Sequence, residues 1–346
     1  MQEQQVPVQF GDGCAVSDDI LYLTAFPDEL DDEISFTRMF TLNTASPEQW
    51  FHIDHDGHRM VSVCLRAAQA AQPRAVCALS EEGVVEIANS QQQSFEQIDG
   101  AGLAQGSRGL GPMHRIREIA HTLYACGAGN QVYKREPQGW TAIDGTLAAA
   151  AQQGMTQTIE RLQAIDGEAT EDQLLDLING IGEVGGLDDI GGTGPDDLYV
   201  CGVDGTLAHW DGQGWTSLRV PTDAHLHSIH AVSAQTVWVC GHNGTLLKGN
   251  RQTGFTSILD HRVSTHLWSV REFDQRVYVG TTKGLWLLNG EQLEAVDLPD
   301  TYELPLVNAL DSTATALWVV ADRFVARLAA GVWQRFDHPD NQGLET

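Results

Sequence analysis

A pattern of short apolar strands and turns recurs about every 40 residues through the second half of the chain. Its four copies are LYVCGVDGTLAHWDGQGWTSL from Leu198, VWVCGHNGTLLKGNRQTGFTSI from Val237, VYVGTTKGLWLLNGEQLEAVDL from Val277 and LWVVADRFVARLAAGVWQRFDH from Leu317. The starts are 39, 40 and 40 residues apart. A fixed period of this length indicates an array of small repeated units rather than one conventional core. It constrains the fold far more than the activity.

Each copy carries the signals of several antiparallel strands. It opens with alternating β-branched, aromatic and aliphatic residues, such as Leu198 to Val200. Asp204-Gly205 or Asn243-Gly244 follows, and such pairs tolerate the positive φ angles of a type I′ hairpin turn. A bulky residue such as Trp215 starts the outer strand, and an apolar-x-x-apolar strand such as Ile229 to Val232 precedes the copy. Four strands in about 40 residues predict one blade of a propeller.

Weaker copies extend the repeat towards the N-terminus. They begin at Leu123, at Ala75 and at Ile20, the last with Trp50-Phe51 as its outer strand after a longer hairpin. Seven units in 346 residues predict an all-β fold, a seven-bladed β-propeller, with residues 1–346 as a single domain. Six blades with an N-terminal extension is the alternative. We expect the ring to close through Val6 to Phe10, as an extra strand beside the last blade.

One interruption of the repeat has a helical period. Between Asp144 and Asp189 the apolar spacing changes from 2 to 3.6, and Thr170 followed by Gln173 reads as a capping box. This predicts a helical hairpin, residues 145–187, inserted between two blades. It either projects as a partner-contact element or plugs one face of the ring. The apolar stripe of the first helix is Met155, Ile159 and Leu162, and that of the second helix is Leu174, Ile178 and Ile181.

The chain is strongly acidic. Its 47 acidic residues against 20 Lys and Arg give a net charge of −27, which repels nucleic acid and anionic membranes and attracts basic partners. Residues 1–60 carry twelve acids against two arginines, and residues 144–189 carry ten against one. The excess serves general solubility, or it forms a docking surface for a cationic protein. The candidate contact residues are Asp28, Glu29, Asp31, Asp32 and Glu33 in a loop, and Asp166, Glu168, Glu171, Asp172 and Asp176 in the hairpin.

The remaining bulk features favour a cytoplasmic protein. The chain has no apolar run of the length that a membrane helix needs, and its N-terminus lacks the pattern of a secretory signal. Cys126, Cys201 and Cys240 occupy the same place in successive copies, which is too far apart for disulfides. We expect them to be small buried residues in a reducing compartment.

Histidine-rich segments are candidates for metal binding, but neither is convincing. HIDHDGH, with His52, His55 and His58, reads as a strand end and an inter-blade turn. HLHSIH contains His225, His227 and His230. His225 and His227 share a strand face, as two metal ligands would, but the spacing of the sequence identifies no third ligand. We therefore expect no metal and no cofactor.

The innermost strands line the central channel with a mixed polar ring. Its members are Arg117, Asp188, His230, Arg271 and Asn308. No acid–base pair can be assigned among them without geometry, so we expect a hydrated channel whose polar groups satisfy one another. The chain also lacks the sialidase box, the signature of the WD repeat and a nucleophile elbow. We predict that the protein is not an enzyme.

The segment GLDDIGGTGPDDLYVCGVDGTLAHWDGQGW, residues 186–215, resembles a bacterial propeller family. The resemblance rests on a Gly-apolar-x-Asp-Ile-x-Gly opening, an Asp-Asp-apolar-Tyr strand and an Asp-Gly-x-x-Trp end, and it extends from 186 to 336 and more weakly over 112–144. Similar propellers are encoded beside type VI secretion effectors and other interbacterial toxins. The resemblance implies a cytoplasmic immunity protein, and it implies no catalytic residues. A looser similarity to photosystem assembly-factor propellers fits the acidic excess and the insertion less well.

Charge and resemblance together lead to one hypothesis. Toxins that cut nucleic acid carry cationic clefts, and an acidic protein with an exposed helical element can occlude such a cleft after steering by complementary charge. We expect an immunity protein that binds and inhibits a cognate basic toxin, a nuclease effector, in competition between bacteria. The alternatives are a hydrolase or lyase with a bound metal or ligand near Arg117, His230 and Arg271, and a scaffold that joins several partners.

Overall fold

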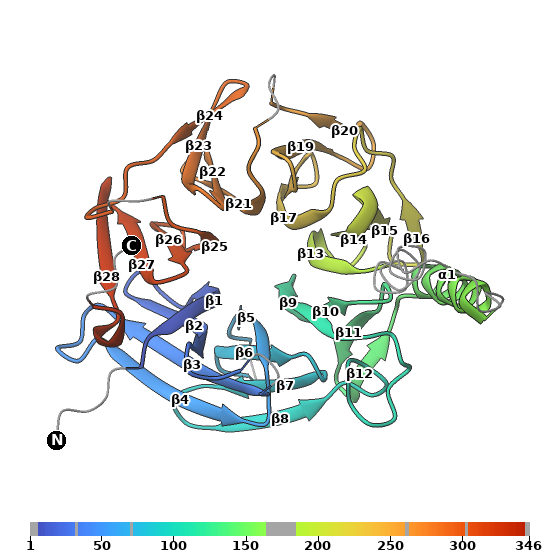
Figure 1. The fold of residues 1–346 in the computed structure, drawn as a ribbon, viewed down its shortest axis with the longest axis horizontal. Coiled ribbons are helices and arrows are strands. Elements are labelled where there is room, and N and C mark those ends of the chain that lie inside the picture. The colour runs from blue at the N-terminus through green and yellow to red at the C-terminus, as the bar shows by residue number, and fades with distance from the viewer. Residues whose placement is uncertain are drawn as a thin grey trace.

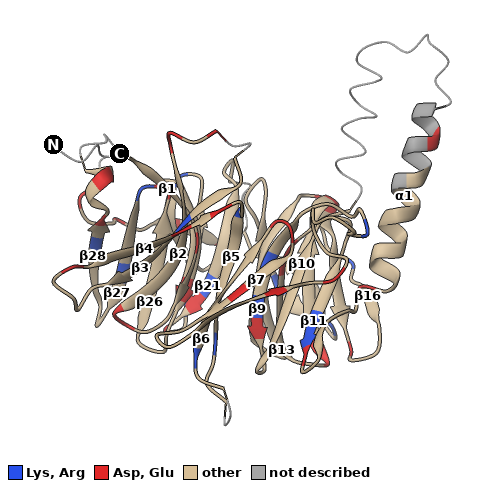
Figure 2. Ribbon diagram, turned by 90° about the horizontal axis from the view of Figure 1, so that it is seen from below, with Lys and Arg blue, Asp and Glu red and all other residues tan. Residues whose placement is uncertain are grey.

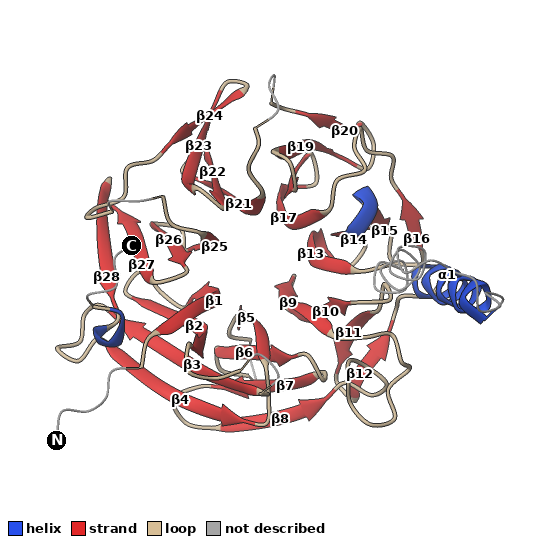
Figure 3. Ribbon diagram, viewed as in Figure 1, coloured by secondary structure: helices blue, strands red, loops and turns tan. Residues whose placement is uncertain are grey.

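A computed structural model describes residues 6–31, 34–69, 72–163, 185–259, 263–301 and 304–342. They form a ring of seven four-stranded antiparallel sheets, so the predicted seven blades are confirmed and six are excluded (Figure 1). Each blade uses four strands consecutive in sequence, and the first strand of each lies innermost (Figure 3). The 40-residue period arises because one blade is one supersecondary unit that buries its faces only against its neighbours.

The first three blades contain the strands that the weaker copies predicted. Blade 1 has β1 (Val8–Ala15), β2 (Ile20–Pro27), β3 (Phe36–Asn43) and β4 (Trp50–Asp56). Blade 2 has β5 (Met60–Arg66), β6 (Ala75–Ser80), β7 (Val84–Ala88) and β8 (Gln93–Gln97). Blade 3 has β9 (Met113–Ile119), β10 (Thr122–Gly127), β11 (Val132–Glu136) and β12 (Gly139–Ala142). The long β2–β3 connection confirms the longer hairpin expected after Ile20.

The four strong copies form blades 4 to 7. Blade 4 has β13 (Leu187–Gly194), β14 (Asp197–Gly202), β15 (Leu207–Trp210) and β16 (Trp215–Ser217). Blade 5 has β17 (Leu226–Ser233), β18 (Thr236–Gly241), β19 (Thr245–Asn250) and β20 (Gly254–Ser257). Blade 6 has β21 (Leu267–Phe273), β22 (Arg276–Thr281), β23 (Gly284–Asn289) and β24 (Gln292–Ala295). Blade 7 has β25 (Val307–Ser312), β26 (Ala316–Ala321), β27 (Phe324–Ala329) and β28 (Val332–Asp337).

Helical structure is confined to the connections. The helix α1 (Thr146–Gln163) lies between β12 and β13, where the sequence predicts the first helix of the insertion. The second predicted stripe lies outside the described residues. Two 3-10 turns occur at Val203–Gly205 and Pro339–Asn341. Among the described helices, none combines the length and the apolar character that crossing a bilayer requires.

The ring closes differently from the prediction for Val6 to Phe10. Instead of adding a strand to blade 7, the chain from Val8 onward forms β1, the innermost strand of blade 1. The glycines after Phe10 made this segment look unlike a strand. They are present because the chain packs closely against its neighbours here. A Cβ on Gly11 would lie 2.7 Å from Thr24 Oγ1, and one on Gly13 would lie 2.8 Å from Val320 Cγ2 in blade 7.

Hydrogen bonds and apolar packing, rather than a shared sheet, hold blade 7 against blade 1. Asn341 accepts from Val8 N at 2.9 Å and donates to Val8 O at 3.0 Å. The carboxylate of Asp311 accepts from Ala15 N at 2.8 Å. Trp318 of β26 is fully buried in one apolar cluster with Phe10 and other side chains of blade 1. The ends of the chain are therefore tied by buried polar and apolar contacts of the same kind that join the other blades.

The three repeat-register cysteines stabilise successive blade junctions. Cys126, Cys201 and Cys240 are fully buried and free, as expected from the sequence. Their sulfur atoms lie 3.9, 3.5 and 3.5 Å from the carbonyl oxygens of Leu187, Leu226 and Leu267 in the next blade. Burial raises the pKa of each thiol, which keeps the proton available as a weak donor.

Candidate partner-binding surface and central channel

Both acidic segments predicted to bind a partner leave the ring on the same face. The four strands of each blade alternate in direction. The first, innermost strand therefore begins on one face of the ring, and the second and the fourth, outermost strands end on that same face. The β2–β3 loop and the connection from β12 to β13 are therefore on that face, which we call the insertion face. In Figure 2, α1 rises beyond this face at one side of the ring. The helix stands clear of the channel, so this described part of the insertion projects (Figure 1 and Figure 2). Residues 164–184 of the insertion lie outside the described residues.

The base of α1 is anchored on the ring. Ala148 and Ala151 are 3% and 6% exposed, and Leu147 packs on the core shared by blades 3 and 4. Asn130 Nδ2 donates to Leu147 O at 3.4 Å. Further along, Glu160 is exposed. The predicted contact residues Asp166, Glu168, Glu171, Asp172 and Asp176 lie outside the described residues, so their role stays a prediction.

The acidic β2–β3 loop is partly neutralised within the ring. Asp28 receives two hydrogen bonds from Arg323 Nη1, at 2.9 and 2.8 Å. Glu29 and Asp31 are exposed, while Asp32 and Glu33 lie outside the described residues. Beside the loop is a hollow of about 520 Å³ that Leu30, Ile34 and Arg59 help to line. From the sequence, the five acids of this loop are predicted to have the same role. The structure shows that Asp28 also helps to hold blade 1 against blade 7.

Exposed acids occur on both faces of the ring. On the insertion face the described ones include Asp99, Asp204, Asp223 and Asp297, and on the opposite face they include Glu48, Asp211, Asp274 and Glu291. The net charge by itself therefore selects no face. What distinguishes the insertion face is the projecting helix.

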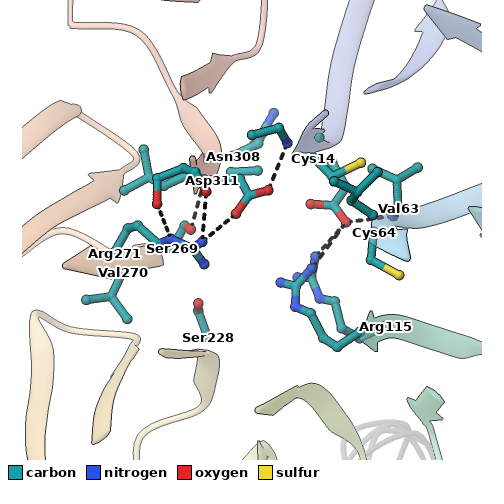
Figure 4. Close-up of a pocket in the computed structure, with 18 of the residues that line it drawn as sticks. Cys14, Val63, Cys64, Arg115, Ser228, Ser269, Val270, Arg271, Asn308 and Asp311 are labelled. Carbon is teal, nitrogen blue, oxygen red and sulfur yellow. Dashed lines mark hydrogen bonds and ion pairs between the residues drawn. The ribbon is translucent and has the colours of Figure 1, made fainter. Parts of the chain in front are cut away.

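The central channel contains partly buried arginines that already have carboxylate partners. A cavity of about 250 Å³ is lined by residues of β1, β5, β9, β17, β21 and β25 (Figure 4). Arg115 Nη1 lies 3.0 Å from Asp12 Oδ2, and Arg117 Nε lies 3.3 Å from Asp189 Oδ1. Arg271 Nη2 lies 2.8 Å from Asp311 Oδ1. The cations are paired inside the wall, which leaves little unbalanced charge to hold an anionic substrate.

The same carboxylates connect adjacent blades. Asp12 Oδ2 accepts from Val63 N at 3.0 Å, and Asp189 Oδ2 accepts from Ile229 N at 2.9 Å. Burial alone would raise the pKa of Asp12, but Arg115, Arg117 and the hydrogen bonds from Val63 and Ser62 together lower the pKa below its usual value. These carboxylates thus hold both a neighbouring backbone and a channel arginine.

The polar ring predicted from the sequence is largely satisfied internally. Arg117 and Arg271 have the partners above, and Asn308 Nδ2 donates to Phe10 O at 2.7 Å. His230 is partly buried beside Arg271 and Arg117. Desolvation first, and then these cations, lower its pKa to about 3. Asp188 differs from the expectation, because its carboxylate contacts histidines at the channel mouth.

Four histidines gather on the insertion face around that mouth. His227 Nδ1 lies 2.6 Å from Asp188 Oδ2, and His225 Nε2 lies 2.9 Å from the same oxygen. His242 follows β18, and its ring centre is 4.5 Å from that of His227 and 4.1 Å from that of His266. His230, grouped with His225 and His227 in the sequence, lies further along β17 and is not part of this cluster. Sequence spacing missed His242 because a hairpin separates it from His227.

The histidines of HIDHDGH do not converge. His52 is exposed on β4, whereas His55 is buried with its Nε2 3.3 Å from Glu86 Oε2. His58 lies after the strand, 3.9 Å from Glu82 Oε2. The interpretation of this segment as a strand end followed by an inter-blade turn is confirmed.

Acidification should destabilise the ring below pH 6.5, in part through His230. The unfolded chain protonates this residue near its ordinary pKa of about 6.5, whereas the folded chain does so only near 3. Between these values the unfolded state binds more protons than the folded state. For this group, the free energy of unfolding therefore decreases by roughly 1.4 kcal/mol for each unit by which the pH is lowered. Urea unfolding at pH 7, 6 and 5 measures the slope.

His230→Gln provides the matched comparison. Glutamine keeps a hydrogen-bond donor in place of the imidazole but does not titrate. The variant should therefore show a shallower loss of stability than the wild type over the same range. Parallel pH profiles for the two proteins would exclude His230 as a source of acid sensitivity.

Comparison with known proteins identifies one curated relative and several solved structures with the same fold. No protein-family model matches the chain. The immune protein Tsi7 of Pseudomonas aeruginosa is 29% identical over 230 residues, which cover 66% of this chain and 65% of Tsi7. The chain thus matches somewhat less than two thirds of the length of that curated relative. This homologue confirms the resemblance to immunity-associated propellers.

Solved structures with the same architecture share little sequence. The WD40 propeller domain of Doa1 superposes with a TM-score of 0.59 at 9% identity, covering 99% of both chains. YCF48 bound to a D1 peptide has a TM-score of 0.59 at 12% identity, covering 97% of this chain and 93% of that one. Sqt1 of Chaetomium thermophilum, bound to the N-terminus of ribosomal protein L10, has a TM-score of 0.56 at 13% identity, covering 98% of this chain and 89% of that one. These similarities establish the propeller fold alone.

Proposed function

We propose that this relative of an immune protein is itself a cytoplasmic immunity protein that binds and inhibits a cognate basic toxin. The relationship to Tsi7 carries the proposal. The net charge of −27 adds a physical reason, because it favours capture of a cationic partner. The insertion face supports it further, since both acidic candidate segments leave the ring there.

We further propose that the toxin is a nuclease effector of an interbacterial secretion system, type VI in particular. Nucleases bind phosphate through cationic surfaces, and a carboxylate-rich projection competes for such a surface by its charge. Occlusion of the substrate-binding surface then inhibits the toxin without any chemical step by the propeller. The finding that the channel arginines are paired with Asp12, Asp189 and Asp311 favours binding at the surface over catalysis in the channel.

Identification of a toxin-like protein in the neighbouring reading frames, followed by its co-expression with this chain, tests the proposal. Sensitive cells that express the toxin alone should stop growing, and co-expression of the propeller should restore growth. The purified pair should form a one-to-one complex by light scattering, and one equivalent of propeller should abolish DNA or RNA cleavage. Persistent toxicity with no complex would contradict the immunity role. A complex without inhibition, or one that contains several different partners, would instead support a scaffold.

A further inference from the structure

The geometry of the histidine cluster points to a binding site for one divalent transition-metal ion of the zinc class, which we propose is held by His225, His227 and His242. One nitrogen from each ring can be chosen so that all three lie within 4.8 Å of one another. In a tetrahedral zinc site with bonds of 2.0–2.1 Å, ligand nitrogens are about 3.4 Å apart. The three nitrogens must therefore move closer together to share one ion.

The carboxylate of Asp188 fixes the tautomer of His227 and lies close to His225. His227 Nδ1 and His225 Nε2 both face Asp188 Oδ2, at 2.6 and 2.9 Å. His227 Nδ1 is hydrogen-bonded to this oxygen, so when that ring donates its proton the lone pair is left on His227 Nε2. A carboxylate behind a metal-binding imidazole fixes its tautomer and orientation in this way and raises its basicity.

A buried nitrogen without a partner strengthens the assignment. His227 is 6% exposed, and its Nε2 is inaccessible to solvent and has no hydrogen-bond partner in the described structure. Such a group is costly to bury unless something binds it. Trp268 lies over the same imidazole, with ring centres 4.4 Å apart, and restricts its movement. The nitrogen that Asp188 leaves unprotonated is thus also a buried nitrogen without a partner.

The donor set selects the class of metal. Three neutral imidazoles suit Zn²⁺, Co²⁺, Ni²⁺ and Cu²⁺, whereas Mg²⁺ and Ca²⁺ prefer oxygen ligands. We assign Zn²⁺, with a fourth position left to water or another ligand. His225, His227 and His242 belong to blade 5 and Asp188 belongs to blade 4. The bound ion would therefore stabilise a blade junction on the insertion face, away from the carboxylate-paired arginines of the channel.

Titration of the untagged, chelator-treated full-length protein with Zn²⁺ tests the site. A chromophoric competitor should report one equivalent bound per chain, and Co²⁺ should give visible bands of a nitrogen-ligated tetrahedral ion. His242→Ala should weaken Zn²⁺ binding at least about tenfold, and Asp188→Asn should weaken it roughly 10- to 100-fold. A hundredfold excess of Zn²⁺ over its dissociation constant should raise the Tm of the wild type by a few degrees and leave that of His242→Ala unchanged.

His52→Ala serves as the matched control, because His52 is an exposed histidine on the outer strand of blade 1. It should bind Zn²⁺ as the wild type does. His242 is partly exposed in a loop, so its replacement should preserve the fold, which circular dichroism and urea unfolding verify. Failure of the wild type to bind one equivalent, or wild-type affinity in His242→Ala, would overturn the assignment.

Discussion

Reversing the charges of the insertion is expected to weaken capture of the basic partner by roughly a hundredfold or more at low salt. The variant carries Asp166→Lys, Glu168→Lys, Glu171→Lys, Asp172→Lys and Asp176→Lys. Exposed pairs contribute about 0.2–1 kcal/mol each, and each 1.4 kcal/mol is tenfold in Kd, so five lost pairs with new repulsion reach this range. Steering by charge acts mainly on association, so the association rate should fall and lose much of its dependence on salt.

Surface plasmon resonance at low and at physiological ionic strength measures both quantities. A two-charge comparison controls for net charge. Glu171→Lys with Asp172→Lys changes the insertion, whereas Glu48→Lys with Glu291→Lys changes exposed turns of the opposite face by the same amount. The first pair should weaken binding and the second should have much less effect. Wild-type affinity of the five-charge variant at low salt would exclude the insertion as the docking surface and leave an immunity role through another surface open.

Removing the carboxylate of Asp189 is expected to lower the free energy of unfolding by about 3–5 kcal/mol, the usual cost of breaking a buried ion pair. Asp189 is fully buried, and its Oδ1 lies 3.5 Å from Arg115 Nε and 3.3 Å from Arg117 Nε. Its Oδ2 accepts from Ile229 N at 2.9 Å. Asp189→Ala therefore removes a counter-charge from two arginines and an acceptor from the blade 4–blade 5 junction at once.

Urea unfolding of Asp189→Ala, Asp189→Asn and Glu48→Ala measures the separate contributions. Asparagine retains an acceptor for Ile229 N and loses the charge, so its stability should fall between those of the other two variants. Glu48 is exposed, and its replacement should change the free energy of unfolding by less than about 0.5 kcal/mol. Equal stability of Asp189→Ala and Glu48→Ala would contradict a structural role for the channel carboxylates.

The repeat made the blades predictable because their determinants are local. Turn pairs such as Asp204-Gly205 and Asn243-Gly244 adopt positive φ in the structure, as their residue types favour. The glycine-rich start of blade 1 was assigned wrongly because the reason for its glycines is not local. Gly11 and Gly13 allow close approach to Thr24 and to Val320, and the second of these contacts spans the whole ring.

The candidate sites divide in the same way. The acidic segments were visible as composition, but their common face follows only from the strand directions in the ring. HLHSIH supplied two neighbouring histidines, whereas His242 joins them from the end of another strand and Asp188 from another blade. The pairing of channel arginines with Asp12, Asp189 and Asp311 likewise joins residues from different blades. No spacing rule relates such residues.

The sequence by itself determined the array and the position of its helical insertion and favoured seven blades over six, because strand period, turn chemistry and helical period act over a few residues. The tertiary structure decided how the ring closes, which charges neutralise one another and which histidines meet. Those outcomes depend on the distance between side chains of separate blades, and that distance is set only when the seven sheets pack around one axis.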